Sequence, residues 1–307
     1  MEACVYRSTG SWYLVRNEKG EFLNARVKGK LKMDDITSTN PIAVGDRVIV
    51  ETEPGQEDYV INEILDRRNY INRVSPHNKN QHHIVASNLD QSLLFATLKE
   101  PKTSLGFIDR FLVTCEAYHV PAIIVLNKTD VHRQRENELM ERVRSVYESI
   151  GYRIFCISIS REEGMKELIE LLRDKTTLLS GHSGVGKSTF INYLLPELKL
   201  RTKEVSGWSG KGLHTTTFAE MYDLPFGGCI IDTPGIREMG LVDISRQELS
   251  HYFPEMRRQL ANCQFNNCMH TEEPGCAVRS ALERGEISPE RYISYLNILG
   301  TIDEKKY

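Results

Sequence analysis

The sequence lacks long apolar runs, a strong charge of either sign and a recognisable export signal. No stretch of its 307 residues approaches the roughly 20 apolar residues that a membrane-spanning helix needs. The opening MEACVYRSTGSWYLV has no basic flank followed by an apolar segment, so no secretory signal is expected. The sequence therefore predicts a cytoplasmic protein, in which disulfide bonds are rare.

Charge gives no general reason to expect a nucleic-acid partner. The formal net charge is only −3, so any contact with RNA has to come from a local patch. With 40% hydrophobic and 26% charged residues, the composition is that of an ordinary globular protein that buries a core. Cysteine is sparse: of seven, four are scattered and are interpreted as small buried hydrophobic residues, namely Cys4, Cys115, Cys156 and Cys229.

The chain divides into three parts by its patterns. Residues 1–72 hold short alternating runs between turn signals, which indicates a small β-barrel or sandwich. Residues 73–240 alternate apolar strands with helical segments, which predicts a mostly parallel sheet with helices on both faces. Residues 241–307 turn helical and carry a cysteine cluster. We therefore expect a multidomain α/β protein with a mainly helical carboxyl-terminal domain.

The stretch GHSGVGKST predicts a phosphate-binding loop. Its pattern, G-x-x-x-x-G-K-[ST] between an apolar strand and a helix, is carried by Gly181, Gly186, Lys187 and Ser188. The backbone N–H groups and the helix dipole hold phosphates, the lysine reaches the β- and γ-phosphates, and the serine binds Mg²⁺. The alternative is a glycine turn that caps a helix. The rest of the expected nucleotide-binding stretch is His182, Ser183, Gly184, Val185 and Thr189.

A second phosphate-sensing motif, DTPG, follows another apolar strand. Asp232 would hold the Mg²⁺ shell through water, and the N–H of Gly235 would meet the γ-phosphate. A bare D-x-x-G is common, but a place at a strand end downstream of the phosphate loop favours this role.

The motif NKTD, at the end of the run VPAIIVL, predicts a guanine-reading loop. The carboxylate of Asp130 can accept hydrogen bonds from guanine N1–H and the 2-amino group, whereas adenine would leave it unpaired. Lys128 would lie across the base, and Asn127 would tie this loop to the phosphate loop. Ser158 lies where a second base-contacting loop is expected. A plain polar turn is the alternative for NKTD.

The base-reading motif precedes the phosphate loop, the reverse of the usual order. Ligands of open parallel sheets bind at the carboxyl ends of strands, and all these motifs lie at such ends. Because the site depends on which strands lie side by side, the sequence predicts a circularly permuted GTPase sheet. In this order DTPG leads straight into the carboxyl-terminal domain, so we expect loss of the γ-phosphate to move that domain.

Candidate catalytic residues lie in the segment KEVSGWSGKGLHTTTFAEMYDL. One of Thr215, Thr216 and Thr217 would reach Mg²⁺ and the γ-phosphate, and Thr217 is favoured. The threonine cluster also suits a β-strand. After DTPG comes Ile236, which cannot orient the attacking water as glutamine does in Ras-type enzymes. His214 or a partner macromolecule is the candidate for that task, and an ordinary polar loop histidine is the alternative.

The stretch CQFNNCMHTEEPGC predicts a structural zinc site. Three thiolates and one imidazole at C-x4-C-x-H-x5-C spacing form a closed tetrahedral set, and no position stays open for metal catalysis. The ligands are Cys263, Cys268, His270 and Cys276. The surrounding residues 241–307 are polar, so we expect Zn²⁺ to supply folding energy. Free thiols beside a chance histidine are the alternative.

Basic residues alternate along RVKGKLK near the amino terminus. On a strand, Arg26, Lys28, Lys30 and Lys32 would share one face. A small barrel with a basic face is a common RNA platform. Lysines also protect an edge strand from pairing with other chains, and the sequence does not separate the two interpretations.

Taken in order, NKTD, GHSGVGKST, GLHTTT, DTPG and CQFNNCMHTEEPGC resemble the circularly permuted small-ribosomal-subunit biogenesis GTPases, the RsgA family, over essentially the whole chain. The resemblance implies an amino-terminal OB-fold, a central GTPase domain that uses GTP, GDP and Mg²⁺, and a domain with one structural Zn²⁺. It also implies binding to the small ribosomal subunit and its rRNA, with subunit-stimulated GTP hydrolysis late in maturation. Leu213 stands where the family pattern leads us to expect arginine, which puts that loop's contact with RNA or phosphate in doubt.

Three other functions stay open on the sequence alone. A P-loop metabolic kinase would leave NKTD unexplained. An rRNA-binding protein that uses GTP as a switch and hydrolyses negligibly is compatible with Ile236. A permuted GTPase acting on another ribosomal particle is disfavoured by the zinc spacing. Nothing in the sequence requires an oligomer, so a monomer is expected.

Overall fold

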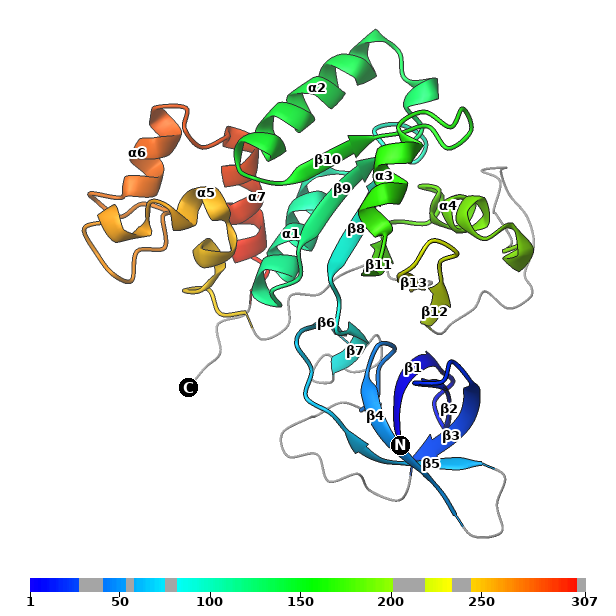
Figure 1. Cartoon of the computed structure of the whole chain (residues 1–307). Coiled ribbons are helices and arrows are strands. Elements are labelled where there is room, and N and C mark those ends of the chain that lie inside the picture. Colours follow the sequence, from blue (N-terminus) through cyan, green and yellow to red (C-terminus); the bar gives the residue numbers. More distant parts are fainter. Residues whose placement is uncertain (28–40, 54–57, 75–81, 201–218, 234–243, 303–307) are drawn as a thin grey trace, which may run out of the picture.

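The computed structural model of the chain describes residues 1–27, 41–53, 58–74, 82–200, 219–233 and 244–302. Figure 1 shows a small barrel below, an α/β body above it and a group of short helices to one side. Within the described residues, no helix combines the length and the apolar character that crossing a membrane requires.

The amino-terminal part is a closed barrel of five strands. Their order is β1-β2-β3-β5-β4, and β1 also pairs with β4, which closes the ring. Inward-facing residues such as Val5, Val15 and Ile61 are fully buried and alternate with more exposed neighbours, as the short alternating runs predicted. The strands are β1 (Glu2–Ser8), β2 (Trp12–Asn17), β3 (Phe22–Val27), β4 (Arg47–Thr52) and β5 (Tyr59–Ile64).

A two-stranded hairpin links the barrel to the body. It consists of β6 (Tyr70–Val74) and β7 (His82–Ser87). The buried Asp46 of the barrel accepts a 2.6 Å hydrogen bond from the hydroxyl of Ser87 and forms a 2.6 Å ion pair with Arg67. This buried carboxylate therefore holds the end of the hairpin against the barrel.

The body is a sheet of order β10-β9-β8-β11-β13-β12, in which only β12 runs antiparallel to its neighbour. Its residues alternate between two cores: Leu94 packs with α1 and α2, and Leu93 packs with α3 and α4. The strands are β8 (Gln91–Ala96), β9 (Ala122–Leu126), β10 (Arg153–Cys156), β11 (Thr176–Ser180), β12 (Glu220–Asp223) and β13 (Cys229–Asp232). The helices are α1 (Leu105–Ala117), α2 (Gln134–Ser149), α3 (Met165–Leu172) and α4 (Lys187–Leu194).

The strand that feeds the phosphate loop lies in the middle of this sheet. β11 pairs with β8, which comes earlier in the chain, and with β13, which comes later. The carboxyl ends of strands that are distant in sequence therefore meet at one edge, which confirms the predicted circular permutation. The body also joins the barrel, because β1 pairs with β12 at Arg7 and Glu220.

The carboxyl-terminal part is mainly helical and packs on the body. It contains α5 (Pro254–Arg257), α6 (Ala277–Glu283) and α7 (Pro289–Leu299). Its core is built around Phe253 and Tyr295, whose rings meet edge to face at 5.5 Å. Val113 of α1 belongs to the same core, so α1 is the helix on which this domain packs.

Candidate functional site

The phosphate loop requires glycine at two positions. Gly181 has φ +134°, and a Cβ there would lie 2.3 Å from the carbonyl oxygen of Phe95. Gly186 has φ +106°, and a Cβ there would lie 2.2 Å from Nδ2 of Asn127. Both the left-handed backbone and the close approach exclude a side chain, so the glycine pattern found in the sequence has a steric cause.

Lys187 opens α4 and turns back into the loop. Its ammonium donates to the carbonyl oxygens of Gly181 at 2.5 Å and His182 at 2.9 Å. Burial lowers the pKa of Lys187, and the Asp232 carboxylate opposes that shift. The ammonium group of Lys187 therefore lies beside the loop backbone, where phosphate oxygens are expected. Ser188 follows it on α4, Val185 is fully buried, and Ser183 and Thr189 are exposed.

Asp232 ends β13 beside the phosphate loop, because β13 pairs with β11 in the register Leu179 to Asp232. Its Oδ1 is buried without a hydrogen-bond partner among the described residues. Burial raises the pKa of Asp232, against the attraction of Lys187. An orphaned buried carboxylate oxygen is costly, and a hydrated Mg²⁺ would satisfy it, so the residues present fit that ion.

Asn127 connects the base-reading loop to the phosphate loop. It follows β9, is only 3% exposed, and donates from Nδ2 to the carbonyl of Val185 at 2.8 Å. Its Oδ1 has no partner in the described part of the chain. Lys128 has a left-handed backbone at φ +64°, and its ammonium reaches the carbonyl of Glu100 at 2.6 Å.

Ser158 holds the carboxylate of Asp130. Its hydroxyl lies 2.7 Å from Asp130 Oδ1 and 3.0 Å from the hydroxyl of Ser160. Burial works to raise the pKa of Asp130, but hydrogen bonds from Ser158, its own backbone and Ser160, and the charge of Arg161, together lower it. Asp130 is therefore ionised at neutral pH and can accept two N–H groups from one base edge.

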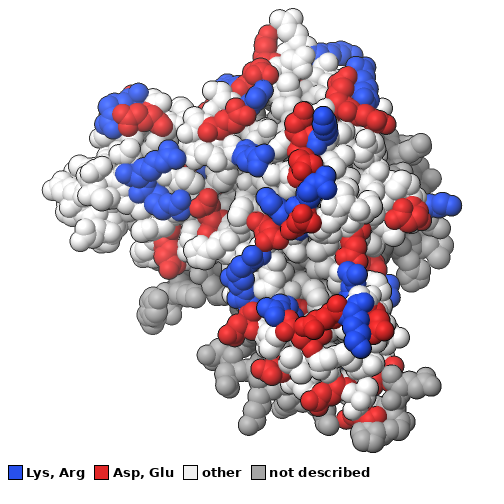
Figure 2. Space-filling model, viewed as in Figure 1, with Lys and Arg blue, Asp and Glu red and all other residues white. Residues whose placement is uncertain are grey.

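Several predicted site residues lie outside the described residues. They are the two catalytic candidates His214 and Thr217, together with Gly235, Leu213, Ile236 and the three lysines Lys28, Lys30 and Lys32. Of the basic strand, Arg26 is described: it is 3.2 Å from Glu53 and sits opposite Trp12 in the sheet register. Figure 2 shows acidic and basic side chains interspersed over the barrel on the face in view.

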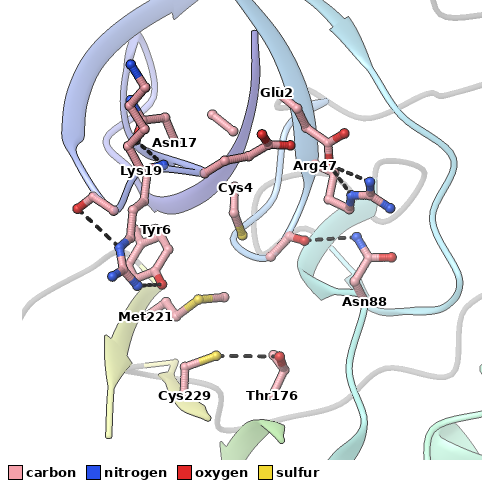
Figure 3. Close-up of a pocket in the computed structure, with 15 residues that line it drawn as sticks. Glu2, Cys4, Tyr6, Asn17, Lys19, Arg47, Asn88, Thr176, Met221 and Cys229 are labelled. Atoms are coloured by element: carbon pink, nitrogen blue, oxygen red, sulfur yellow. Dashed lines mark hydrogen bonds and ion pairs between the residues drawn. The ribbon is translucent and has the colours of Figure 1, made fainter. Parts of the chain in front are cut away.

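A hollow of about 570 Å³ lies between the barrel and strands β12 and β13, as Figure 3 shows. It contains none of the nucleotide-motif residues. Its arginines are paired within the protein, Arg47 with Glu2 at 2.5 Å and Arg16 with Asp223 at 2.9 Å. Size alone therefore does not locate the functional site, and the strand-end motifs do.

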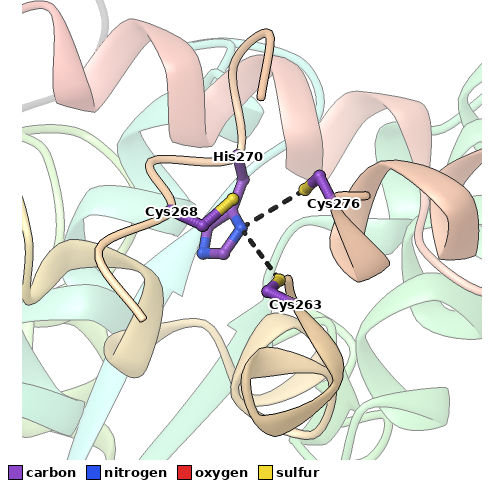
Figure 4. Close-up of side chains that lie close together, drawn as sticks. All are labelled: Cys263, Cys268, His270 and Cys276. Carbon is purple, nitrogen blue, oxygen red and sulfur yellow. Dashed lines mark hydrogen bonds between the residues drawn. The ribbon is translucent and has the colours of Figure 1, made fainter. Parts of the chain in front are cut away.

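The four predicted zinc ligands converge (Figure 4). The candidate ligand atoms of Cys263, Cys268, His270 and Cys276 all lie within 4.8 Å of one another. Nδ1 of His270 is 3.7 Å from the sulfur of Cys263 and 3.5 Å from that of Cys276. Zn–S and Zn–N bonds of about 2.3 and 2.0 Å place tetrahedral ligand atoms about 3.5 Å apart, so the donor set fits Zn²⁺.

The sequence did not reveal the residues that hold this ligand loop. Glu273 accepts 2.8 Å hydrogen bonds from the backbone N–H groups of Met269 and Thr271. Tyr292 and Tyr295 of α7 donate to the carbonyls of His270 and Met269 at 2.5 and 2.7 Å. A glutamate between two ligands is a weak local signal, and the tyrosines carry none, because they act from a later helix.

Comparison with known proteins settles the family. The RsgA N-terminal domain model matches residues 2–60, and the RsgA GTPase model matches residues 64–242. The chain belongs to the RsgA GTPase family. Members of this family are GTP hydrolases. The cluster of three cysteines and one histidine lies beyond both matched ranges.

Curated relatives match over the full length. A protein from Bacteroides fragilis strain YCH46 is 47% identical over 100% of this chain and 99% of its own length. One from Cytophaga hutchinsonii is 50% identical over 97% of this chain and 98% of its own. Both are named small ribosomal subunit biogenesis GTPase RsgA.

Among the solved structures that match, two share this fold over nearly their whole length. YjeQ from Thermotoga maritima superposes with a TM-score of 0.78 at 33% identity, covering 97% of each chain. YloQ, described as a circularly permuted GTPase, gives a TM-score of 0.74 at 28% identity over 100% of this chain and 96% of its own. The strand order found here thus agrees with that description.

Proposed function

We propose that this protein binds the small ribosomal subunit and hydrolyses GTP to GDP in response to it, late in the maturation of that subunit. The observation that carries the proposal is the meeting of Asp130, Asn127 and Lys187 at one sheet edge. The small ribosomal subunit is chosen as the partner because the full-length relatives are named after it. The ribosomal partner in turn favours a cytoplasmic monomer that contacts rRNA.

Each side chain at the sheet edge has a task in this proposal. Asp130 accepts the two N–H groups of the guanine edge, and Lys128 covers the base plane. The backbone of residues 181–189 donates to the phosphates, while Lys187 moves its ammonium onto the β- and γ-phosphates. Ser188 and Asp232 would hold Mg²⁺, and the ion would supply positive charge beside the phosphates.

Hydrolysis also needs a group that orients water. The side chain of Ile236 has no hydrogen-bonding atom for this task, so we assign it to His214, with Thr217 on the Mg²⁺ and γ-phosphate side. In this proposal the subunit stimulates hydrolysis by acting on these residues. The three functional units are residues 1–72 for RNA contact, 73–240 for GTP and 241–307 around one structural Zn²⁺.

Co-sedimentation tests the choice of partner. Purified protein is mixed with small or large ribosomal subunits, in the presence of GDP or a non-hydrolysable GTP analogue. We expect binding to small subunits only, and at least about tenfold tighter with the GTP analogue, as a differential affinity for two states requires. Equal binding to both particles would refute the assignment, and preference for the large subunit would favour a permuted GTPase of another particle.

A further inference from the structure

The phosphate loop contacts α1, the helix on which the carboxyl-terminal part packs. This part, described over residues 244–302, is called the zinc domain below. The carbonyl of His182 is one of the two that hold Lys187, so the backbone of His182 belongs to the phosphate cradle. The ring of His182 stacks on Phe107 of α1 with centroids 3.7 Å apart and planes 29° apart. Burial and then the Lys187 charge lower the pKa of His182, which keeps a neutral ring against the phenyl face.

The other side of α1 faces the zinc domain. Residues two apart on a helix point about 200° from one another, and Asp109 is accordingly fully buried on the side away from Phe107. Asp109 accepts 2.6 Å hydrogen bonds from Arg291 of α7 and Tyr147 of α2. Arg291 also binds Glu255 of α5 at 2.6 Å. One buried ion network thus joins α1 to two helices of the zinc domain.

Further contacts extend this junction along α1. Arg110 donates to the hydroxyl of Thr301 at 2.9 Å, and Glu116 pairs with Arg257 at 2.9 Å. Val113, between them, is fully buried in the zinc-domain core. Close-packed interiors transmit displacement rather than absorb it, so α1 and the zinc domain have to move together.

We propose that His182 and Phe107 are positioning residues that couple nucleotide binding at the phosphate loop to the zinc domain through α1. A phosphate competes with the carbonyls of Gly181 and His182 for the Lys187 ammonium. When Lys187 turns to the phosphate, the His182 carbonyl loses its donor. The His182 ring then changes its position against the ring of Phe107. By linkage, fixing the zinc domain changes nucleotide affinity by the same factor. The proposal rests on nucleotide binding at this loop and does not depend on the ribosomal partner.

Hydrogen exchange of the full chain, with and without saturating GDP and with no ribosome present, tests the coupling. In the wild type, GDP slows exchange in the phosphate loop and, by about fivefold, in α5 and α7. Phe107→Leu keeps an apolar side chain but removes the ring stack, so the effect on α5 and α7 disappears while the phosphate loop stays protected. Phe226→Leu, the same change in a partly buried residue that packs in the core of the other sheet face, keeps the wild-type response.

Two results overturn the proposal. One is wild-type protein in which GDP protects the phosphate loop but leaves α5 and α7 unchanged. The other is an undiminished response of α5 and α7 in Phe107→Leu. If GDP fails to protect the wild-type phosphate loop at all, nucleotide binding there is refuted, and the proposed GTPase function falls together with the coupling.

Discussion

At the scale of single residues, the account depends most on one carboxylate. Asp130 follows β9 and is held by the hydroxyl of Ser158, which comes from the loop after β10. The two residues are 28 positions apart, and parallel pairing of β9 with β10 brings them together. An ionised acceptor fixed in this way is able to accept hydrogen bonds from a base edge that presents two donors.

Asp130→Asn should exchange the base preference. The amide keeps the shape but replaces one acceptor with a donor, so guanine loses a charged hydrogen bond and gains a repulsive contact. We expect GDP affinity to fall about 100-fold, which corresponds to about 3 kcal/mol. Xanthosine diphosphate, whose ring offers an oxygen in place of the 2-amino group, should bind better to the variant than to wild type. Titration with fluorescent analogues of both nucleotides measures this, and an unchanged preference would contradict the role of Asp130.

Ser158→Ala should move the acid limit of nucleotide binding. In the wild type the pKa of Asp130 is below its ordinary value of 3.8, so its carboxylate stays charged as pH falls and binding is lost only through that lowered pKa. Removing the Ser158 donor destabilises the charged form and raises the pKa of Asp130. GDP binding measured against pH should therefore fail at higher pH in Ser158→Ala. If wild type and Ser158→Ala lost GDP binding at the same acidic pH, Ser158 would not act on Asp130.

At the scale of elements, the site is built from loops at strand ends that touch one another. The side chain of Asn127 occupies the space that a Cβ of Gly186 would need, at 2.2 Å. The base-reading loop and the phosphate loop are thus packed as one unit, although 59 positions separate these residues (186 minus 127). A displacement of one loop therefore has to displace the other.

Gly186→Ala should damage both folding and binding, and Gly151→Ala is its matched control. Gly151 has φ +107°, almost the value at Gly186, but nothing lies within 4 Å of its Cβ position. We expect Gly151→Ala to cost about 1–2 kcal/mol of unfolding free energy from backbone strain alone, with GDP affinity unchanged. Gly186→Ala adds overpacking and should cost about 3 kcal/mol or more, with affinity reduced by about tenfold or more. Urea unfolding and GDP titration of both variants measure this, and equal effects would refute the packing of the two loops.

The motifs could be predicted from the sequence because their residues are close together along the chain. The phosphate loop, NKTD and the four zinc ligands each fit a short spacing, and alternation along residues 1–72 predicted the barrel, although it left a sandwich open. Long-range partners have no such signal. The pair of Asp109 and Arg291 spans 182 positions. The stack of Phe107 on His182 joins α1 to the phosphate loop far downstream, so no local pattern predicts it.

At the scale of the whole molecule, a buried ion network joins the GTPase body to the carboxyl-terminal helices. Arg291 of α7 is 1% exposed and lies 4.6 Å above the ring of Phe253. Its guanidinium is therefore buried at the interface of the zinc domain with α1. Such a buried charge is tolerated only when it is fully paired. The zinc domain and the GTPase body are therefore expected to unfold together.

Zinc removal should test that expectation. Cys276→Ser removes one ligand of a closed set, so we expect the loss of one bound zinc per chain and of several kcal/mol of unfolding free energy. Zinc release measured with a chromogenic chelator and thermal unfolding monitored by circular dichroism report the two effects. Cys156→Ser, outside the cluster, is the control and should keep both zinc and stability. Wild-type stability in Cys276→Ser would mean that the metal does not support the fold.

The most direct test of the central claim is the rate of GTP turnover by the purified protein alone, with small subunits and with large subunits. The account predicts slow turnover alone, because the side chain of Ile236 cannot orient the water and His214 takes that task only in the presence of the subunit. It predicts an increase of about 10³-fold with small subunits only, the lower end of what a completed site supplies. The same slow rate in all three samples would contradict subunit-stimulated hydrolysis and leave a GTP-switched rRNA-binding protein as the better account.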